Sequence, residues 1–165
     1  MAIRHEAVVD NWSVIVEQGA GHGQNVLSSI EREIKEANLP NISTGQQDIS
    51  GGLFGSKRRF LCVNHNNLRD YRVYIGARDY GTHLDVGWYL TIQPSFLKRN
   101  ISKYTTGNPQ ALSWQIDFFS QQDLHAFVTV MHHCVKRATE VLFEELKLDP
   151  SGLTNARSKG FLAVW

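Results

Sequence analysis

The segment YRVYIGARDYGTHLDVGWYLTI, residues 71–92, decides the fold, because two runs of alternating apolar residues flank a short turn in it. The apolar positions are Tyr71, Val73, Ile75 and Ala77 in the first run, and Leu84, Val86, Trp88, Leu90 and Ile92 in the second. Alternation with a period of two is typical of strands that bury one face. The turn at residues 79–82 contains Gly81, so the segment predicts an antiparallel β-hairpin.

The segments around the hairpin predict the rest of the sheet. Residues 59–65 (RFLCVNH) are apolar on both faces and predict a buried strand. A fourth strand is predicted by a second alternating series, Leu112, Trp114, Ile116 and Phe118. Residues 40–56 are polar and glycine-rich, which predicts a long connection with room for one short strand near residues 49–54. The apolar tail at residues 159–165 predicts a terminal strand or a docked segment.

Two segments have the spacing of amphipathic helices. Before Pro40, one helical face carries Val26, Leu27, Ile30, Ile34 and Ala37. We expect Ser120 to cap a longer helix that ends near Leu148. Phe119 and Leu124 occupy the two positions of a hydrophobic staple at its start. The apolar stripe of this helix is Leu124, Val128, Met131, Val135, Ala138 and Leu142.

These patterns predict a single α+β domain over residues 1–165. We expect an antiparallel sheet of four to five strands, an N-terminal helix, and a long C-terminal helix packed across one face. At 1.5 Å per residue the long helix spans about 40 Å, enough to cross a four-stranded sheet. Residues 5–17 fit a helix or a strand equally well, and both stay open.

The composition favours an ordinary globular protein of the cytoplasm. The chain has 165 residues, of which 42% are hydrophobic, and it has two cysteines, too few for a disulfide framework. No apolar run approaches the roughly 18 residues that span a bilayer. The N-terminus has no apolar core of a secretory signal. We expect no membrane association and two reduced thiols.

Positive charge is concentrated in residues 57–110, which hold nine Lys or Arg residues and three Asp residues, although the net charge of the chain is +1. All five tyrosines also lie in this segment. Cations interleaved with aromatic rings are what nucleic-acid binding requires, because cations neutralise phosphates and rings stack on bases. The same composition also suits half-exposed strands of a protein with no such function.

A glycine-rich run forms a second candidate site. In VIVEQGAGHG, residues 14–23, an acidic residue at a strand end precedes three alternating glycines and then a helix. This order resembles the first motif of the Rossmann-like methyltransferases, which implies a nucleotide-type cofactor held over residues 19–23. The antiparallel strands predicted after Pro40 depart from the doubly wound sheet of that family. A plain connecting loop is the other interpretation.

The outward face of the hairpin is the site that we favour. If the apolar residues face the long helix, strand alternation places a polar set on the other face. This candidate ligand-binding set is Arg72, Tyr74, Arg78, His83, Asp85 and Tyr89. Gly76 and Gly87 lie among these residues, and missing side chains can leave a groove for a ligand. Alternatively, the face is simply solvated, with Arg72 or Arg78 paired to Asp85.

We find no pattern of a catalytic or metal site. The helical histidines His125, His132 and His133 lack the spacing of four that places two imidazoles on one metal. Cys62 and Cys134 fit core thiols. We therefore expect a non-enzymatic binding domain without a cofactor, whose open sheet face and loop at residues 94–110 contact a partner or an anionic ligand. The alternatives are a nucleic-acid-binding protein that uses residues 57–110, and a small transferase that uses residues 19–23.

Overall fold

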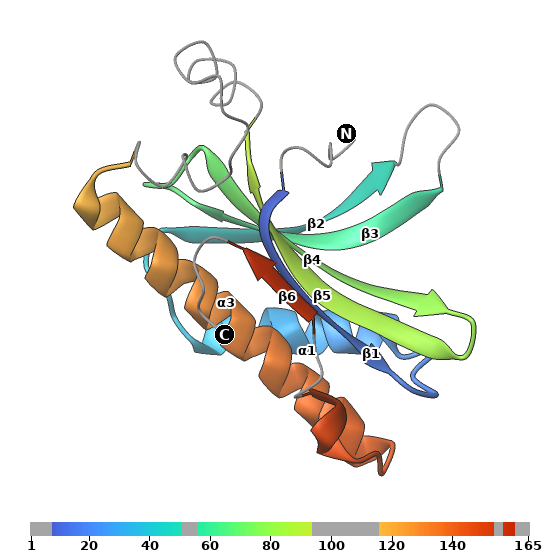
Figure 1. The fold of residues 1–165 in the computed structure, drawn as a ribbon. Helices are drawn as coiled ribbons and strands as arrows, with labels where there is room; N and C mark the ends of the chain where they lie inside the picture. Colours follow the sequence, from blue (N-terminus) through green and yellow to red (C-terminus); the bar gives the residue numbers. More distant parts are fainter. Residues whose placement is uncertain (1–7, 51–55, 94–115, 154–156, 161–165) are drawn as a thin grey trace.

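The computed structural model describes residues 8–50, 56–93, 116–153 and 157–160, and shows one antiparallel sheet with two helices against it (Figure 1). The sheet has the order β2-β3-β4-β5-β1-β6. Its strands are β1 (Val8–Val16), β2 (Ile42–Ser50), β3 (Lys57–His65), β4 (Tyr71–Tyr80), β5 (His83–Ile92) and β6 (Arg157–Gly160). The helices are α1 (Gly23–Glu36), α3 (Phe118–Glu145) and the short 3-10 helix η3 (Pro150–Leu153). The predicted α+β class is confirmed.

The predicted hairpin is the centre of this sheet. β4 and β5 pair from Tyr71 opposite Ile92 to Tyr80 opposite His83, so Gly81 and Thr82 make the turn. Gly81 has a positive φ of 62°, a conformation that glycine adopts without steric cost. β1 pairs with β5 on one side and with β6 on the other, which resolves residues 8–16 as a strand.

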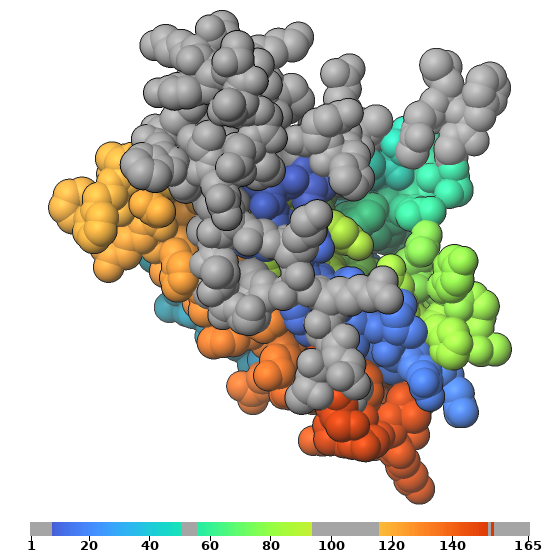
Figure 2. Space-filling view, viewed as in Figure 1, coloured from blue at the N-terminus to red at the C-terminus, as the bar shows by residue number. Residues whose placement is uncertain are grey.

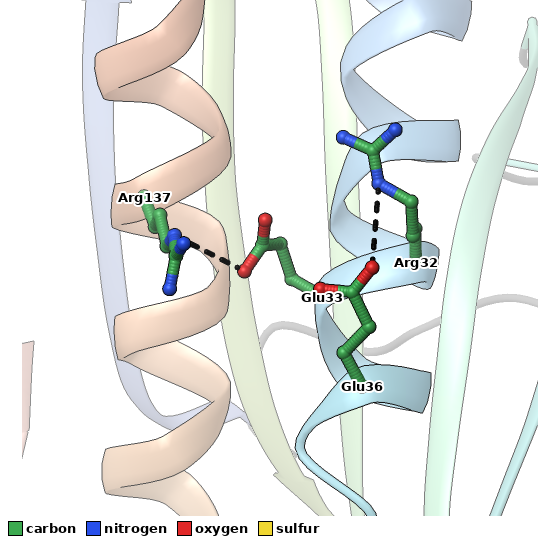
Figure 3. A network of polar contacts seen from close by, with 4 residues as sticks. All are labelled: Arg32, Glu33, Glu36 and Arg137. Carbon is green, nitrogen blue, oxygen red and sulfur yellow. Dashed lines mark ion pairs between the residues drawn. The ribbon is translucent and has the colours of Figure 1, made fainter.

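Both helices cover the same face of the sheet. Apolar residues of α1, of α3 and of the inner face of the hairpin form one continuous core, in which Trp88, Met131 and Ile30 are fully buried. An ion pair joins the helices, with Arg137 Nε 3.4 Å from Glu33 Oε2 (Figure 3). In the space-filling view, α3 and the β4–β5 turn lie on opposite sides of the visible face (Figure 2). No described helix has the length and apolar character needed to cross a membrane.

The start of α3 differs from the prediction. Asp117 caps the helix, and its Oδ1 accepts hydrogen bonds from the main-chain N–H groups of Phe119 and Ser120, each at 3.0 Å. Phe118 belongs to α3 and Ile116 to the bend before it, so neither continues a strand; Leu112 and Trp114 lie outside the described residues. The predicted staple is also wrong, because Phe119 is 74% exposed. Asp117 caps the helix in place of Ser120, because its carboxylate accepts hydrogen bonds from two N–H groups of the first turn.

The sequence also failed to predict the length of β2. This strand runs along the edge of the sheet and pairs with β3 from Ile42 opposite His65 to Ser50 opposite Lys57. Within β2 only Ile49 is buried, and the other residues on both faces are partly or fully exposed. An edge strand of this kind is held by main-chain hydrogen bonds, and these leave no apolar alternation in the sequence.

The predicted stripe of α3 is buried along its whole length, which gives a direct test of the core. We expect Met131→Asp to lower the free energy of unfolding by at least about 3 kcal/mol, because an unpaired carboxylate would replace a side chain with 0% exposure. Val141→Asp is the matched control on the same helix, since Val141 is 41% exposed; it should cost no more than about 1 kcal/mol. Urea denaturation of both variants measures the difference, and equal losses would contradict this packing.

A buried histidine lies between two tryptophans of the core. Trp88 Nε1 donates a hydrogen bond to His132 Nδ1 at 3.3 Å, and the ring of Trp12 meets His132 edge-on with centroids 5.0 Å apart. Burial, with smaller contributions from the positive charges of His133 and Lys136, lowers the pKa of His132 to about 4. The imidazole is therefore neutral in the folded protein at pH 7, as its acceptor role toward Trp88 requires.

This lowered pKa predicts a loss of stability in mild acid. In the unfolded state His132 takes up a proton as the pH falls below 6.5, whereas in the folded state it stays neutral down to about pH 4. Acid therefore favours the unfolded state over this range. We expect about 2 kcal/mol of unfolding free energy to be lost at this site between pH 7 and pH 5. His132→Gln should reduce the pH dependence over that range, measured by urea denaturation. His125→Gln, at an exposed position of the same helix, should keep it, and an unchanged pH dependence in His132→Gln would refute the assignment.

Candidate functional site

The sheet splits between β3 and β4, and the split holds a cavity. The β3–β4 ladder runs from Asn64 opposite Arg72 only as far as Phe60 opposite Gly76. β3 continues back to Lys57 on β2, and β4 continues to Tyr80 on β5. Figure 1 shows the two strands diverging beyond this point. A cavity of about 620 Å³ lies between them, and we call it the fork cavity.

The start of α1 closes one side of the fork cavity. Gly21, Gly23, Gln24 and Leu27 line it there. Gly23 allows this approach, because a Cβ at that position would lie 3.1 Å from the carbonyl oxygen of Ala77 on β4. α1 begins without a side-chain cap and without an acidic residue in its first turn. The positive end of its dipole therefore adds to the charge of the cavity wall.

Cationic side chains dominate the lining. They are Lys57, Arg58 and Arg59 at the start of β3 and Arg78 on β4, against the carboxylates of Asp79 and Asp85. Arg59 Nε lies 3.2 Å from Asp48 Oδ1, and Arg78 Nη2 lies 4.0 Å from Asp85 Oδ2. Among the described residues, no ion pair engages Lys57 or Arg58. The fork cavity is therefore positive overall.

The carboxylates of the cavity already interact with other groups of the protein. Asp79 Oδ1 accepts a hydrogen bond from the main-chain N–H of Gly21 at 3.1 Å, which ties the glycine-rich loop to the end of β4. Burial raises the pKa of Asp85, although Arg78 and Arg58 act in the opposite direction. Burial and the charge of Asp85 likewise raise the pKa of Tyr89. Mild acid therefore weakens the negative charge of Asp85 sooner than that of an ordinary carboxylate, and makes the cavity more positive.

The structure divides the predicted ligand-binding set into two groups. Arg78, Asp85 and Tyr89 line the fork cavity. The other three, Arg72, Tyr74 and His83, lie away from it. Tyr74 is 2% exposed and packs with Ile49 and Cys62 in a small second core. Arg72 directs its guanidinium to the side-chain amide of Gln93, and with this amide flipped its oxygen accepts a hydrogen bond from Nη2 at 2.9 Å. His83 lies opposite Tyr80 beside the turn.

The two glycines of the predicted groove on the hairpin pack closely against other parts of the chain. A Cβ at Gly76 would lie 2.8 Å from Cε1 of Phe60, whose ring covers that position. A Cβ at Gly87 would lie 2.6 Å from the carbonyl oxygen of Trp12 on β1. Both glycines permit close packing within the protein, and Gly76 also lines the fork cavity, so a ligand groove beside Gly76 stays a prediction. The Arg78–Asp85 contact of the solvated alternative is present.

The glycines at residues 19–23 also have structural roles. Gly19 packs against Leu84 and Val16, where a Cβ would come within 2.9 Å of Leu84 Cβ, and Gly21 has a positive φ of 89°. β1 is antiparallel to both its neighbours, so the doubly wound sheet implied by the methyltransferase resemblance is absent from the described fold. The loop nevertheless reaches the fork cavity, which the sequence did not predict.

The favoured set omitted most of the lining, including Lys57, Arg58, Arg59 and Phe60, which the sequence placed only in the alternative basic segment of residues 57–110. Their signal was the basic run KRR within the positively charged segment, but no pattern in the chain shows that β3 meets Arg78.

Burial raises the pKa of the Cys62 thiol and that of Cys134, the latter to about 11, which disfavours a reactive thiolate at either position. Within the described ranges, no three His, Cys, Asp or Glu residues lie together as metal ligands would.

Comparison of the chain with protein-family models, with curated proteins and with solved structures finds no match. The chemistry of the fork cavity is therefore the guide to function.

The filled glycine positions give a paired test of the packing behind the site. We expect Gly87→Ala to lower the free energy of unfolding by at least about 2 kcal/mol, because the new methyl group would collide with the backbone of β1. Gly45→Ala on β2 is the control, since a Cβ there meets open space; its effect should stay within about 0.5 kcal/mol. Chemical denaturation of both variants measures the two changes. A tolerated Gly87→Ala would mean that β1 and β5 are not this close.

Proposed function

We propose that this protein is a non-enzymatic binding domain that holds an anionic ligand in the fork cavity. The observation that carries the proposal is the convergence of Lys57, Arg58, Arg59 and Arg78 on one cavity of about 620 Å³. This volume lies within the range of about 300 to 1,000 Å³ that is usual for ligand sites. Grouped cations repel one another, and an anionic ligand relieves that repulsion.

Apolar groups beside the cations favour a ligand with some flat or aliphatic surface. Phe60 and Tyr89 are half-buried and line the cavity, with their ring centroids 6.4 Å apart. A ligand that contacts these rings loses water from apolar surface while its charge meets Arg58 and Arg78. The loop at residues 94–110, which we also expected to contribute, lies outside the described residues.

Binding fits the lining better than catalysis does. Among the described lining residues, the groups that could act in acid–base chemistry are Lys57, Asp79, Asp85 and Tyr89. Asp79 is held by the Gly21 N–H group, and the raised pKa of Tyr89 keeps its hydroxyl protonated at neutral pH.

Nucleic acid is one class of anion that the same charge could attract, but the tyrosines give it little support. Tyr71 and Tyr74 are 3% and 2% exposed, so neither ring is free to stack on a base. Tyr80 is 67% exposed, and the Arg78 guanidinium lies 5.3 Å from its ring centroid. An oligonucleotide therefore belongs in the binding test as one probe among several.

Removal of two cavity cations tests the proposal. We expect Arg58→Ala with Arg78→Ala to weaken anion binding by about tenfold for each lost charge, because each contact contributes roughly 1.4 kcal/mol. Calorimetric titration with tripolyphosphate, a single-stranded oligonucleotide and a glutamate-rich peptide measures the affinities.

Arg72→Ala is the matched control, because Arg72 lies on the same strand but outside the cavity. It should bind like the parent protein, and all variants should keep their melting temperature within a few degrees, since the removed side chains are partly exposed. Equal losses in the control and the double variant, or no binding of any probe, would refute the fork cavity as an anion site.

A further inference from the structure

We propose that the ligand of the fork cavity is an extended acidic peptide that pairs with the sheet between β3 and β4. This inference rests on the proposed function and names the class of its ligand. A peptide strand added to a sheet gains main-chain hydrogen bonds from the strand edge, and its side chains supply the selectivity. Both features have a counterpart in the fork cavity.

The first counterpart is the pair of strand edges. Beyond Phe60 and Gly76, residues 57–59 of β3 keep only β2 as a neighbour, and residues 77–80 of β4 keep only β5, within the described sheet. Antiparallel geometry directs the N–H and C=O groups of every second residue toward the open side. At Ala77 this side of β4 is covered, because its carbonyl oxygen lies against Gly23 at the start of α1.

The second counterpart is the placement of cations on both sides of the sheet. Strand alternation places Lys57 and Arg59 on the face of Leu61, which packs in the core with the helices. Arg58 lies on the opposite face, which is also the face of Phe60 and Arg78.

An extended strand projects successive side chains to opposite faces. Neighbouring acidic residues of one inserted strand would therefore meet cations on both sides of the sheet. A compact anion such as a single phosphate would leave the cations of one face without a partner. The geometry thus matches an extended carboxylate-bearing chain better than a small anion.

The length of the fork limits the size of the inserted segment. The segments without a β3–β4 partner are three residues long on β3 and four on β4, and on β4 the first of these, Ala77, packs against α1. At about 3.3 Å per residue, three or four paired residues of ligand span roughly 10 to 13 Å. A six-residue peptide therefore spans the fork with four paired residues and extends beyond it by one residue at each end.

The experiment compares two peptides of equal charge. One is a fluorescein-labelled Thr-Glu-Glu-Glu-Glu-Thr, and the other is the same peptide with an N-methyl group on every peptide bond, which can donate to neither strand edge. Fluorescence anisotropy should show at least tenfold weaker binding of the methylated peptide. The protein is identical in both titrations, so misfolding of a variant cannot cause the difference. Hydrogen exchange should show protection of those amides of residues 77–80 that face away from β5 when the unmethylated peptide is bound.

Each other outcome overturns the inference in a recognisable way. Equal affinity of the two peptides without amide protection would mean attraction by charge alone. Tripolyphosphate or oligonucleotide binding that depends on Arg58 and Arg78, with no peptide binding, would overturn the inference and leave the proposed function intact. Peptide binding that persists in the double variant would place the peptide elsewhere. Binding of none of the probes would overturn both proposals.

Discussion

The contact between α3 and the inner face of the β4–β5 hairpin determines where the other parts of the molecule lie. Trp88 on β5 and Met131 on α3 both have 0% exposure in this contact. Because side chains alternate along a strand, burial of Trp88 also fixes the position of Tyr89 on the other face. The polar face of the hairpin is thus a consequence of its core, and the fork cavity begins where that face meets β3.

The sheet divides next to a close packing contact at a single glycine. Phe60 places its ring over Gly76, at the last pair of the β3–β4 ladder. Beyond this pair, α1 approaches β4 at Ala77, where Gly23 leaves room for the backbone. The early residues of β3 stay with β2 instead, so Arg58 and Arg78 approach the same cavity from two separate strands.

Periodicity predicted the elements that are buried on one face. The hairpin at residues 71–92 and the stripe of α3 were both found as predicted, because each has a buried face that leaves a pattern in the sequence. β2 had no such pattern, and the cap of α3 depended on the side-chain contacts of Asp117. For the site, alternation correctly placed Arg78 and Asp85 on one face, but the neighbour of a strand in the sheet is not a local property of its sequence. It could therefore not be predicted that Arg58 lines the same cavity as Arg78 and Asp85.

The polar edge strand β2 has a consequence for how the protein behaves at high concentration. With a net charge of only +1, long-range repulsion between molecules is weak near neutral pH. An edge strand with free main-chain groups can then template intermolecular sheet growth, the first step toward fibrils. β2 resists this growth through Gly45 and the charged Asp48, because a tightly packed fibril interface disfavours a buried charge and glycine weakens a strand. Replacement of these residues to strengthen the fold would thus increase the risk of self-assembly.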